Sequence, residues 1–180
     1  MKKISVFILV FFICQNLIGF RHSAPGDQDG ITAFFLVRHA EKVRDGSADP
    51  PLTASGAARA EELAYMLKHI DLNAIYSTPY RRTKQTVMPT AREKGLDVKL
   101  YKPGDKGFLA MVLHEYPGGN VLIVGHSNTI PGMANELRGA FAFSDLDDST
   151  YDNMFIACVP AEGKPVILRM RFGAHTPKKE

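Results

Sequence analysis

The chain has 180 residues, 45% of them hydrophobic, which is enough for one domain of ordinary size and too little for two. Its formal charge of +3 falls to zero when residues 1–24 are set aside, because they carry Lys2, Lys3 and Arg21 and no acids. The rest of the chain therefore lacks the basic excess that predicts a nucleic-acid surface.

The first residues have the layout of an export leader. Two lysines precede an apolar run over residues 4–14, so we expect residues 1–24 to be a secretory signal peptide. An uncleaved membrane anchor is the alternative, because residues 4–20 are nearly long enough to span a bilayer. Lipidation of Cys14 is a third possibility, disfavoured by the bulky Ile13 before it. The protein is thus expected to be periplasmic or secreted, with membrane contact only through this N-terminus.

The rest of the chain reads as one α/β domain. Residues 25–30 are polar and rich in Gly and Pro, which predicts a linker; residues 31–175 are expected to form the domain and 176–180 a tail. Short apolar runs alternate with longer amphipathic stretches, as in strands joined by crossover helices. The expected fold is a three-layer α/β/α sandwich, with a mainly parallel central sheet and an antiparallel C-terminal edge.

The first predicted elements are a strand and a helix. Residues 31–37 are apolar at consecutive positions, as in a strand covered on both faces. Residues 51–70 predict a helix that starts at Thr53 or Ser55. Its buried stripe is expected to consist of Leu63, Met66, Leu67 and Ile70.

The same alternation continues to the end of the domain. Strands are expected at residues 73–78, 97–101 and 120–126, and helices at 80–95, 105–116 and 128–139. The first of these helices should be kinked by Pro89, and the second should be capped by Asp105. Residues 154–160 and 165–173 predict an antiparallel hairpin.

Two strongly apolar strands run directly into a histidine. Arg38 and His39 follow the first strand, and His126 ends the strand at residues 120–126. In a parallel sheet the ligand crevice lies beyond the carboxyl ends of the strands. If these strands are neighbours, both histidines face that crevice, and either Arg81 or Arg82 from the helix after residues 73–78 should point to the same place.

Two arginines and two histidines without a compensating carboxylate cluster indicate an anion site. Guanidinium groups match phosphate oxygens with paired, charge-assisted hydrogen bonds, and helix amino termini add backbone donors. One histidine would attack phosphorus as a nucleophile, while the other would hold an equatorial oxygen. This scheme requires no metal, and the sequence offers no aspartate-rich loop or His-x-His cluster that would argue for one.

Four ordered segments resemble the histidine phosphatase superfamily, whose fold is that of phosphoglycerate mutase. They are LVRHAEK (36–42), PLTASG (51–56), STPYRRTKQT (77–86) and VLIVGHSN (121–128). The resemblance covers about residues 31–140. It implies a phosphatase that works through a covalent phosphohistidine and needs no cofactor.

The resemblance also assigns roles to individual residues. His39 would be phosphorylated during turnover, and Arg38, Arg82 and His126 would bind the phosphoryl group. The functional arginine of the serine-proline-arginine segment lies three residues beyond the proline, which selects Arg82 and leaves Arg81 on the helix surface.

The proton donor is open at this stage, because the chain lacks the longer insertion that carries this acid in many members. Asp105 is one candidate, with a plain helix cap as its alternative role. Glu41 is another, with an ion pair to Lys42 or Arg44 as the alternative. The polar residues 146–153 either border the pocket or form a simple loop before the hairpin.

The expected substrates are phosphorylated small molecules or phosphoproteins, because a member with little lid resembles the small phosphohistidine phosphatases as much as small-molecule phosphatases. Two other functions are compatible with the same residues. One is a phosphomutase, which the short lid disfavours because water must be kept from the intermediate. The other is a non-catalytic module that binds phosphate or phosphopeptides.

Overall fold

A computed structural model describes residues 30–175; the expected leader, most of the linker and the tail lie outside the described residues. The described part contains a six-stranded sheet with helices on both faces. The strands are β1 (Ile31–Arg38), β2 (Ala74–Ser77), β3 (Val98–Leu100), β4 (Asn120–Gly125), β5 (Asn153–Pro160) and β6 (Val166–Arg171). The helices are α1 (Ala54–Met66), α2 (Arg81–Lys94), α3 (Phe108–Glu115) and α4 (Thr129–Arg138).

The sheet has the order β3-β2-β4-β1-β5-β6. β1 to β4 are parallel to one another, whereas β5 and β6 form the antiparallel hairpin predicted at the C-terminal edge. The register pairs Arg38 of β1 with Gly125 of β4, and Ser77 of β2 with Val124 of β4. The carboxyl ends of these three neighbouring strands therefore lie at one level.

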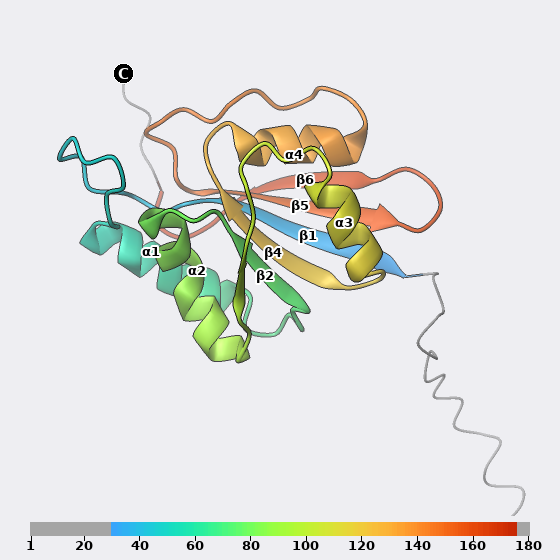
Figure 1. The fold of residues 1–180 in the computed structure, drawn as a ribbon, viewed down its shortest axis with the longest axis horizontal. Coiled ribbons are helices and arrows are strands. Elements are labelled where there is room, and N and C mark those ends of the chain that lie inside the picture. The colour runs from blue at the N-terminus through green and yellow to red at the C-terminus, as the bar shows by residue number, and fades with distance from the viewer. Residues whose placement is uncertain (1–29, 176–180) are drawn as a thin grey trace, which may run out of the picture.

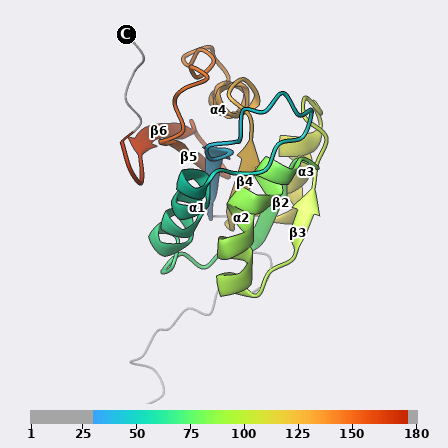
Figure 2. The same ribbon diagram turned by 90° about the vertical axis from the view of Figure 1, so that its left-hand side faces the viewer.

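The helices divide between the two faces of the sheet, which confirms the predicted three-layer sandwich. α1 and α2 cover one face, and α3 and α4 cover the other, as Figures 1 and 2 show. Residues of β1 alternate between the two cores: Phe34 and Leu36 pack with α3 and α4, while Phe35 and Val37 pack with α1 and α2. Since both faces are covered, these side chains are all apolar.

The topology opens a crevice between β1 and β4. The chain leaves β1 toward α1 on one face of the sheet and leaves β4 toward α4 on the other (Figure 1). Adjacent parallel strands whose following helices part in this way form the ligand crevice of open α/β sheets.

Local details both agree with and correct the sequence predictions. Thr53 caps α1, and its hydroxyl accepts a hydrogen bond from the N–H of Gly56 at 3.0 Å. Met66 is 38% exposed and does not join the buried stripe, because it lies beside the exposed Tyr65 on the solvent side of the last turn, whereas Leu63 on the same turn is buried. The N-cap of α3 is Gly107, not Asp105. α2 continues through Pro89 to Lys94.

None of the helices within residues 30–175 combines the length and the apolar character that crossing a membrane would require.

Candidate functional site

A cavity of about 370 Å³ lies at the carboxyl ends of β1, β2 and β4. All four residues predicted from the strand ends line it: Arg38, His39, Arg82 and His126. The rings of the two histidines meet edge to face, with 5.6 Å between their centroids. The structure thus brings together groups that are far apart in the sequence.

The hydrogen bonds of His39 determine which ring nitrogen carries the proton. Nδ1 lies 2.8 Å from the carbonyl oxygen of Ala40, and a carbonyl can only accept. Nδ1 must therefore be the protonated nitrogen, which leaves the lone pair of the neutral ring on Nε2. The backbone N–H of His39 donates to the carbonyl of Gly125 on β4 at 2.9 Å and fixes the residue at the strand end.

Two threonines determine the tautomer of His126 in the same manner. The Thr83 hydroxyl donates to the carbonyl oxygens of Thr78 and Tyr80, so it can only accept from the Thr78 hydroxyl, 2.9 Å away. Thr78 thereby uses its own proton and must accept from Nε2 of His126, at 3.1 Å. Nε2 carries a hydrogen, and Nδ1 of the neutral His126 ring is the free acceptor.

Both imidazoles are neutral in the folded protein at physiological pH. Burial, reinforced by the charge of Arg38, lowers the pKa of His39 to about 3. Burial and then the guanidinium groups of Arg82 and Arg38 lower the pKa of His126 to about 4. A neutral His39 has its nucleophilic lone pair available without prior deprotonation.

Arg38 is held by the segment that precedes β5. Its Nη1 donates to the carbonyl oxygens of Asp147 at 2.7 Å and Thr150 at 2.8 Å, and its Nη2 to that of Asp148 at 3.2 Å. The guanidinium also stacks on the ring of Tyr151, 4.4 Å from the centroid. These contacts leave Arg38 only 2% exposed, so its orientation toward the cavity is fixed.

Arg82 reaches the cavity from the first turn of α2. Its guanidinium lies over the ring of Tyr80 at 4.5 Å and 3.7 Å from the carboxylate of Asp49. Arg81 is exposed, as the family pattern implied. Among the described residues, the buried Nε atoms of Arg38 and Arg82 have no hydrogen-bond partner. Two guanidinium groups that line one cavity suit an anionic ligand.

The PLTASG segment packs against the loop that carries His39. Gly56 lies so close to Glu41 that a Cβ at this position would be 2.2 Å from the Glu41 carbonyl oxygen, so only glycine fits. The same oxygen accepts from the N–H of Thr53 at 2.9 Å. The start of α1 is thus packed against the backbone two residues beyond His39.

The STPYRRTKQT segment also contacts the loop that carries His39. The hydroxyl of Thr86 on α2 accepts from the backbone N–H of Ala40 at 3.0 Å and donates to the carbonyl of Arg82 at 2.7 Å. One buried side chain therefore links the loop that carries His39 to the turn that carries Arg82.

The two proton donors proposed from the sequence do not line the cavity. Glu41 forms a buried ion pair with Arg59, whose Nη2 and Nε donate to its carboxylate at 2.7 and 3.0 Å. Burial would raise the pKa of Glu41, but the hydrogen bonds from Arg59 outweigh it and the pKa is lowered. The partner is Arg59 on α1, not Lys42 or Arg44. A carboxylate that is kept ionised and doubly bonded is a poor acid.

Asp105 is not among the residues that line the cavity either. Its carboxylate is exposed and accepts from the N–H of Gly107 at 3.0 Å, and it lines a different cavity, beside α4. Its role is local: it closes the turn before α3.

Arg59, the partner of Glu41, has a further contact. Its Nη1 donates to the carbonyl of Phe172, just after β6, at 2.9 Å.

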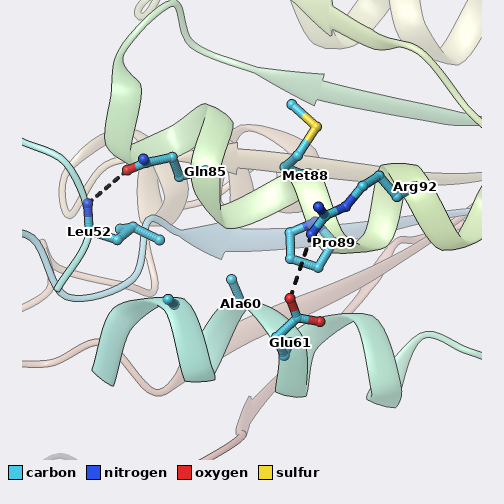
Figure 3. A pocket seen from close by; sticks show the side chains of 8 residues that line it. Leu52, Ala60, Glu61, Gln85, Met88, Pro89 and Arg92 are labelled. Carbon is cyan, nitrogen blue, oxygen red and sulfur yellow. Dashed lines mark hydrogen bonds and ion pairs between the residues drawn. The ribbon is translucent and has the colours of Figure 1, made fainter. Parts of the chain in front are cut away.

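A second cavity, of about 270 Å³, lies between α1 and α2 and has a different character (Figure 3). Its walls are mostly apolar side chains, and Pro89 on α2 points toward Ala60 on α1. The polar contacts at its edge are paired: Gln85 accepts from the N–H of Leu52, and Arg92 pairs with Glu61 at 3.6 Å. It holds neither a histidine nor an unpartnered cation, so the chemistry is assigned to the strand-end cavity.

Comparison with known proteins agrees with this geometry. Residues 34–102, which include His39, Arg82 and the segments between them, match the model of the histidine phosphatase superfamily, branch 1. Over these residues the chain resembles this superfamily. Over 69 residues it is 39% identical to phosphoserine phosphatase 1 of Hydrogenobacter thermophilus, a match covering 35% of this chain and 33% of that protein. The chain thus matches about a third of the length of this curated relative.

Solved structures of superfamily proteins share the fold. The protein histidine phosphatase SixA, solved in complex with tungstate, superposes with a TM-score of 0.63 at 20% identity, covering 77% of this chain and 96% of SixA. A mutant phosphoserine phosphatase of Entamoeba histolytica, in complex with phosphoserine, gives 0.58 at 18% identity, covering 78% and 96%. At these identities the likeness concerns the fold.

Other residues of the site were not singled out by the sequence. Thr78 and Thr83 lie inside the STPYRRTKQT segment. They set the tautomer of His126 only because β2 and β4 are neighbours, and the sequence alone does not show that pairing. Asp148 and Tyr151 belong to the polar stretch at 146–153, which does border the cavity. Within the described residues, no cluster of three or more His, Cys, Asp or Glu side chains has the arrangement of a metal site.

Proposed function

We propose that this chain is a metal-independent phosphatase that hydrolyses phosphomonoesters, or phosphohistidine, through a covalent phosphohistidine on His39. One observation carries the proposal: the neutral His39 ring has its lone pair on Nε2 in a cavity lined by Arg38, Arg82 and His126. A nucleophile beside anion-binding donors is the arrangement that phosphoryl transfer needs.

In the first step, Nε2 of His39 attacks phosphorus, a P–N bond forms, and the bond from phosphorus to the leaving oxygen breaks. The charge on the equatorial oxygens is met by the guanidinium groups of Arg38 and Arg82, which line the cavity. The Nδ1–H of His39 stays on the carbonyl of Ala40, which stabilises the cationic phosphoimidazole. In the second step, water attacks phosphorus and the P–N bond breaks, which releases phosphate.

His126 acts on the same phosphoryl group. Since its Nε2–H is used by Thr78, only Nδ1 can face an oxygen of the substrate. A phosphoryl dianion close to this ring favours its protonated form, and the Nδ1–H then donates to that oxygen. The shared phosphoryl group thus couples binding to the protonation of His126.

The names of the relatives support a substrate class. The names of the two phosphoserine phosphatases and of the protein histidine phosphatase SixA point to phosphoserine and phosphohistidine, and SixA was solved with tungstate, a tetrahedral oxyanion. The export leader expected at residues 1–24 adds that the substrate is met in the periplasm or outside the cell. Phosphorylated small molecules and phosphoproteins are both compatible with the cavity.

The test compares His39→Ala with His114→Ala, a change at an exposed histidine on α3. Both variants and the wild type are assayed with p-nitrophenyl phosphate and a phosphopeptide in excess chelator. We expect hydrolysis by wild type and His114→Ala, none by His39→Ala, and an acid-labile, alkali-stable phosphoprotein in rapid-quench samples of the active proteins. Equal hydrolysis by all three would refute the proposal.

The same assay separates the alternative functions. Transfer of the phosphoryl group to another hydroxyl, without release of phosphate, would identify a mutase. Phosphate affinity that depends on Arg82, without turnover of any ester, would identify a binding module.

A further inference from the structure

The strand-end cavity contains an acid that the sequence analysis did not propose. Of the described residues that line this cavity, Asp148 is the one with a carboxylate. Its Oδ1 lies 3.3 Å from Nη2 of Arg38, and its side chain is 89% exposed, so the carboxyl group stands at the mouth of the cavity. It is therefore open to an incoming substrate.

The backbone that carries Asp148 is held in place by the site itself. Arg38 binds the carbonyl oxygens of Asp147, Asp148 and Thr150. The N–H of Leu146 donates to the carbonyl of Ser127, next to His126, at 2.9 Å, and the Leu146 side chain is buried. Asp148 is thus presented from a segment tied to both strand ends.

The proposed reaction needs an acid at this mouth. An alkoxide leaves phosphorus poorly unless a proton reaches it as the bond breaks. His39 is the attacking base, and His126 uses its Nε2–H for Thr78 and, in the proposed scheme, its Nδ1–H for a phosphoryl oxygen. Lys42 also lines the cavity, but an ammonium is a much weaker acid than a carboxyl group.

We propose that Asp148 is the general acid and base of this site; the inference rests on the proposed function. The carboxyl group of Asp148 gives its proton to the leaving oxygen while the P–N bond to His39 forms. The resulting carboxylate then takes a proton from the attacking water as the new P–O bond forms and the P–N bond breaks. Asp148 is protonated again, His39 is neutral, and the products are the alcohol and phosphate.

The position of Arg38 explains how Asp148 becomes free to reach the leaving oxygen. Without a phosphoryl group near it, Arg38 attracts the carboxylate at 3.3 Å. A bound dianion competes for the charge of Arg38 and so loosens its contact with Asp148. The carboxyl group can then turn from Arg38 toward the leaving oxygen.

Leaving groups of different quality provide the test. Asp148→Asn is assayed with an alkyl phosphate such as phosphoserine, which needs a proton donor, and with p-nitrophenyl phosphate, which does not. We expect a loss in kcat of about 10²- to 10⁴-fold on the alkyl phosphate and little change on the aryl phosphate. Asp145→Asn, an exposed carboxylate on the same segment, is the matched control and should behave as wild type.

Each alternative predicts a different result. An equal loss on both substrates, with a raised KM, would mean that Asp148 only positions Arg38, and would overturn the inference. So would a leaving-group-dependent loss in Asp105→Asn or Lys42→Met instead of Asp148→Asn. A wild type that hydrolyses neither substrate and forms no phosphohistidine would refute the proposed function itself, and this inference with it.

Discussion

The hydroxyl oxygen of Thr78 lies 3.1 Å from Nε2 of His126 and, having given its own proton to Thr83, can only accept there. Thr78→Val removes this acceptor and leaves a buried N–H unpaired, at a cost of about 1–3 kcal/mol. We expect kcat/KM to fall by about 10-fold or more, and Thr78→Ser to restore it. Nitrogen chemical shifts of the His126 ring should show a loss of the single Nε2–H tautomer in Thr78→Val; an unchanged tautomer would contradict the assignment.

The contact between Gly56 and the Glu41 carbonyl gives a prediction on stability. The Cβ of Gly56→Ala would meet that backbone oxygen at 2.2 Å, so the start of α1 or the His39 loop must shift. We expect a loss of about 1–3 kcal/mol in the free energy of unfolding, together with lower activity. Gly132→Ala is the control: it lies in α4 with open space around the new Cβ and should gain about 0.5–1 kcal/mol.

The two histidines give a prediction on pH. Their folded pKa values, about 3 for His39 and about 4 for His126, lie below the unfolded value near 6.5. Below pH 6.5 these histidines bind protons in the unfolded chain but not in the folded protein. The free energy of unfolding therefore falls as the pH drops toward 4, by up to about 1.4 kcal/mol per pH unit for each ring.

Two measurements check this. Denaturant unfolding at pH 7, 6 and 5 should show the progressive loss of stability. In NMR titrations of the protein without phosphate, neither the His39 nor the His126 ring should titrate between pH 5 and 8. Midpoints near 6.5 for His39 and His126 would contradict the burial argument.

Adjacent arginines on α2 provide the sharpest pair of variants. Arg82 lines the cavity with a buried, unpartnered Nε, and Arg81 is exposed one residue earlier. Arg82→Ala should lower kcat/KM by about 10²- to 10³-fold and weaken the binding of tungstate. Arg81→Ala should remain within about twofold of wild type. Isothermal titration with tungstate and steady-state kinetics measure both; similar losses in the two variants would show that the effect is one of general charge.

The sequence predicted the fold and the four central side chains because both depend on patterns that are local. Apolar runs mark β1 and β4, and residues placed directly after such runs must appear at the carboxyl edge of a parallel sheet. His39 and His126 were found in this way, and the family pattern separated Arg82 from Arg81.

The sequence could not show the surroundings of the acids, because distant parts of the chain set them. Glu41 is close to His39 in sequence, yet Arg59 from α1 occupies its carboxylate. Asp105 follows a strand, but Gly107 takes the cap position and Asp105 closes the turn outside the cavity. Asp148 lies more than one hundred residues from Arg38 along the chain, and nothing in the local pattern indicates that the two meet.

The bond from Arg59 to the carbonyl of Phe172 has a consequence for how the protein matures. A ribosome makes Arg38, His39, Arg82 and His126 well before it reaches residue 172. The Phe172 carbonyl, which binds the Arg59 partner of Glu41, is among the last described parts to be made. A growing chain therefore contains all four of these side chains before it contains Phe172. The contact between Arg59 and the Phe172 carbonyl can form only after β6 has been made.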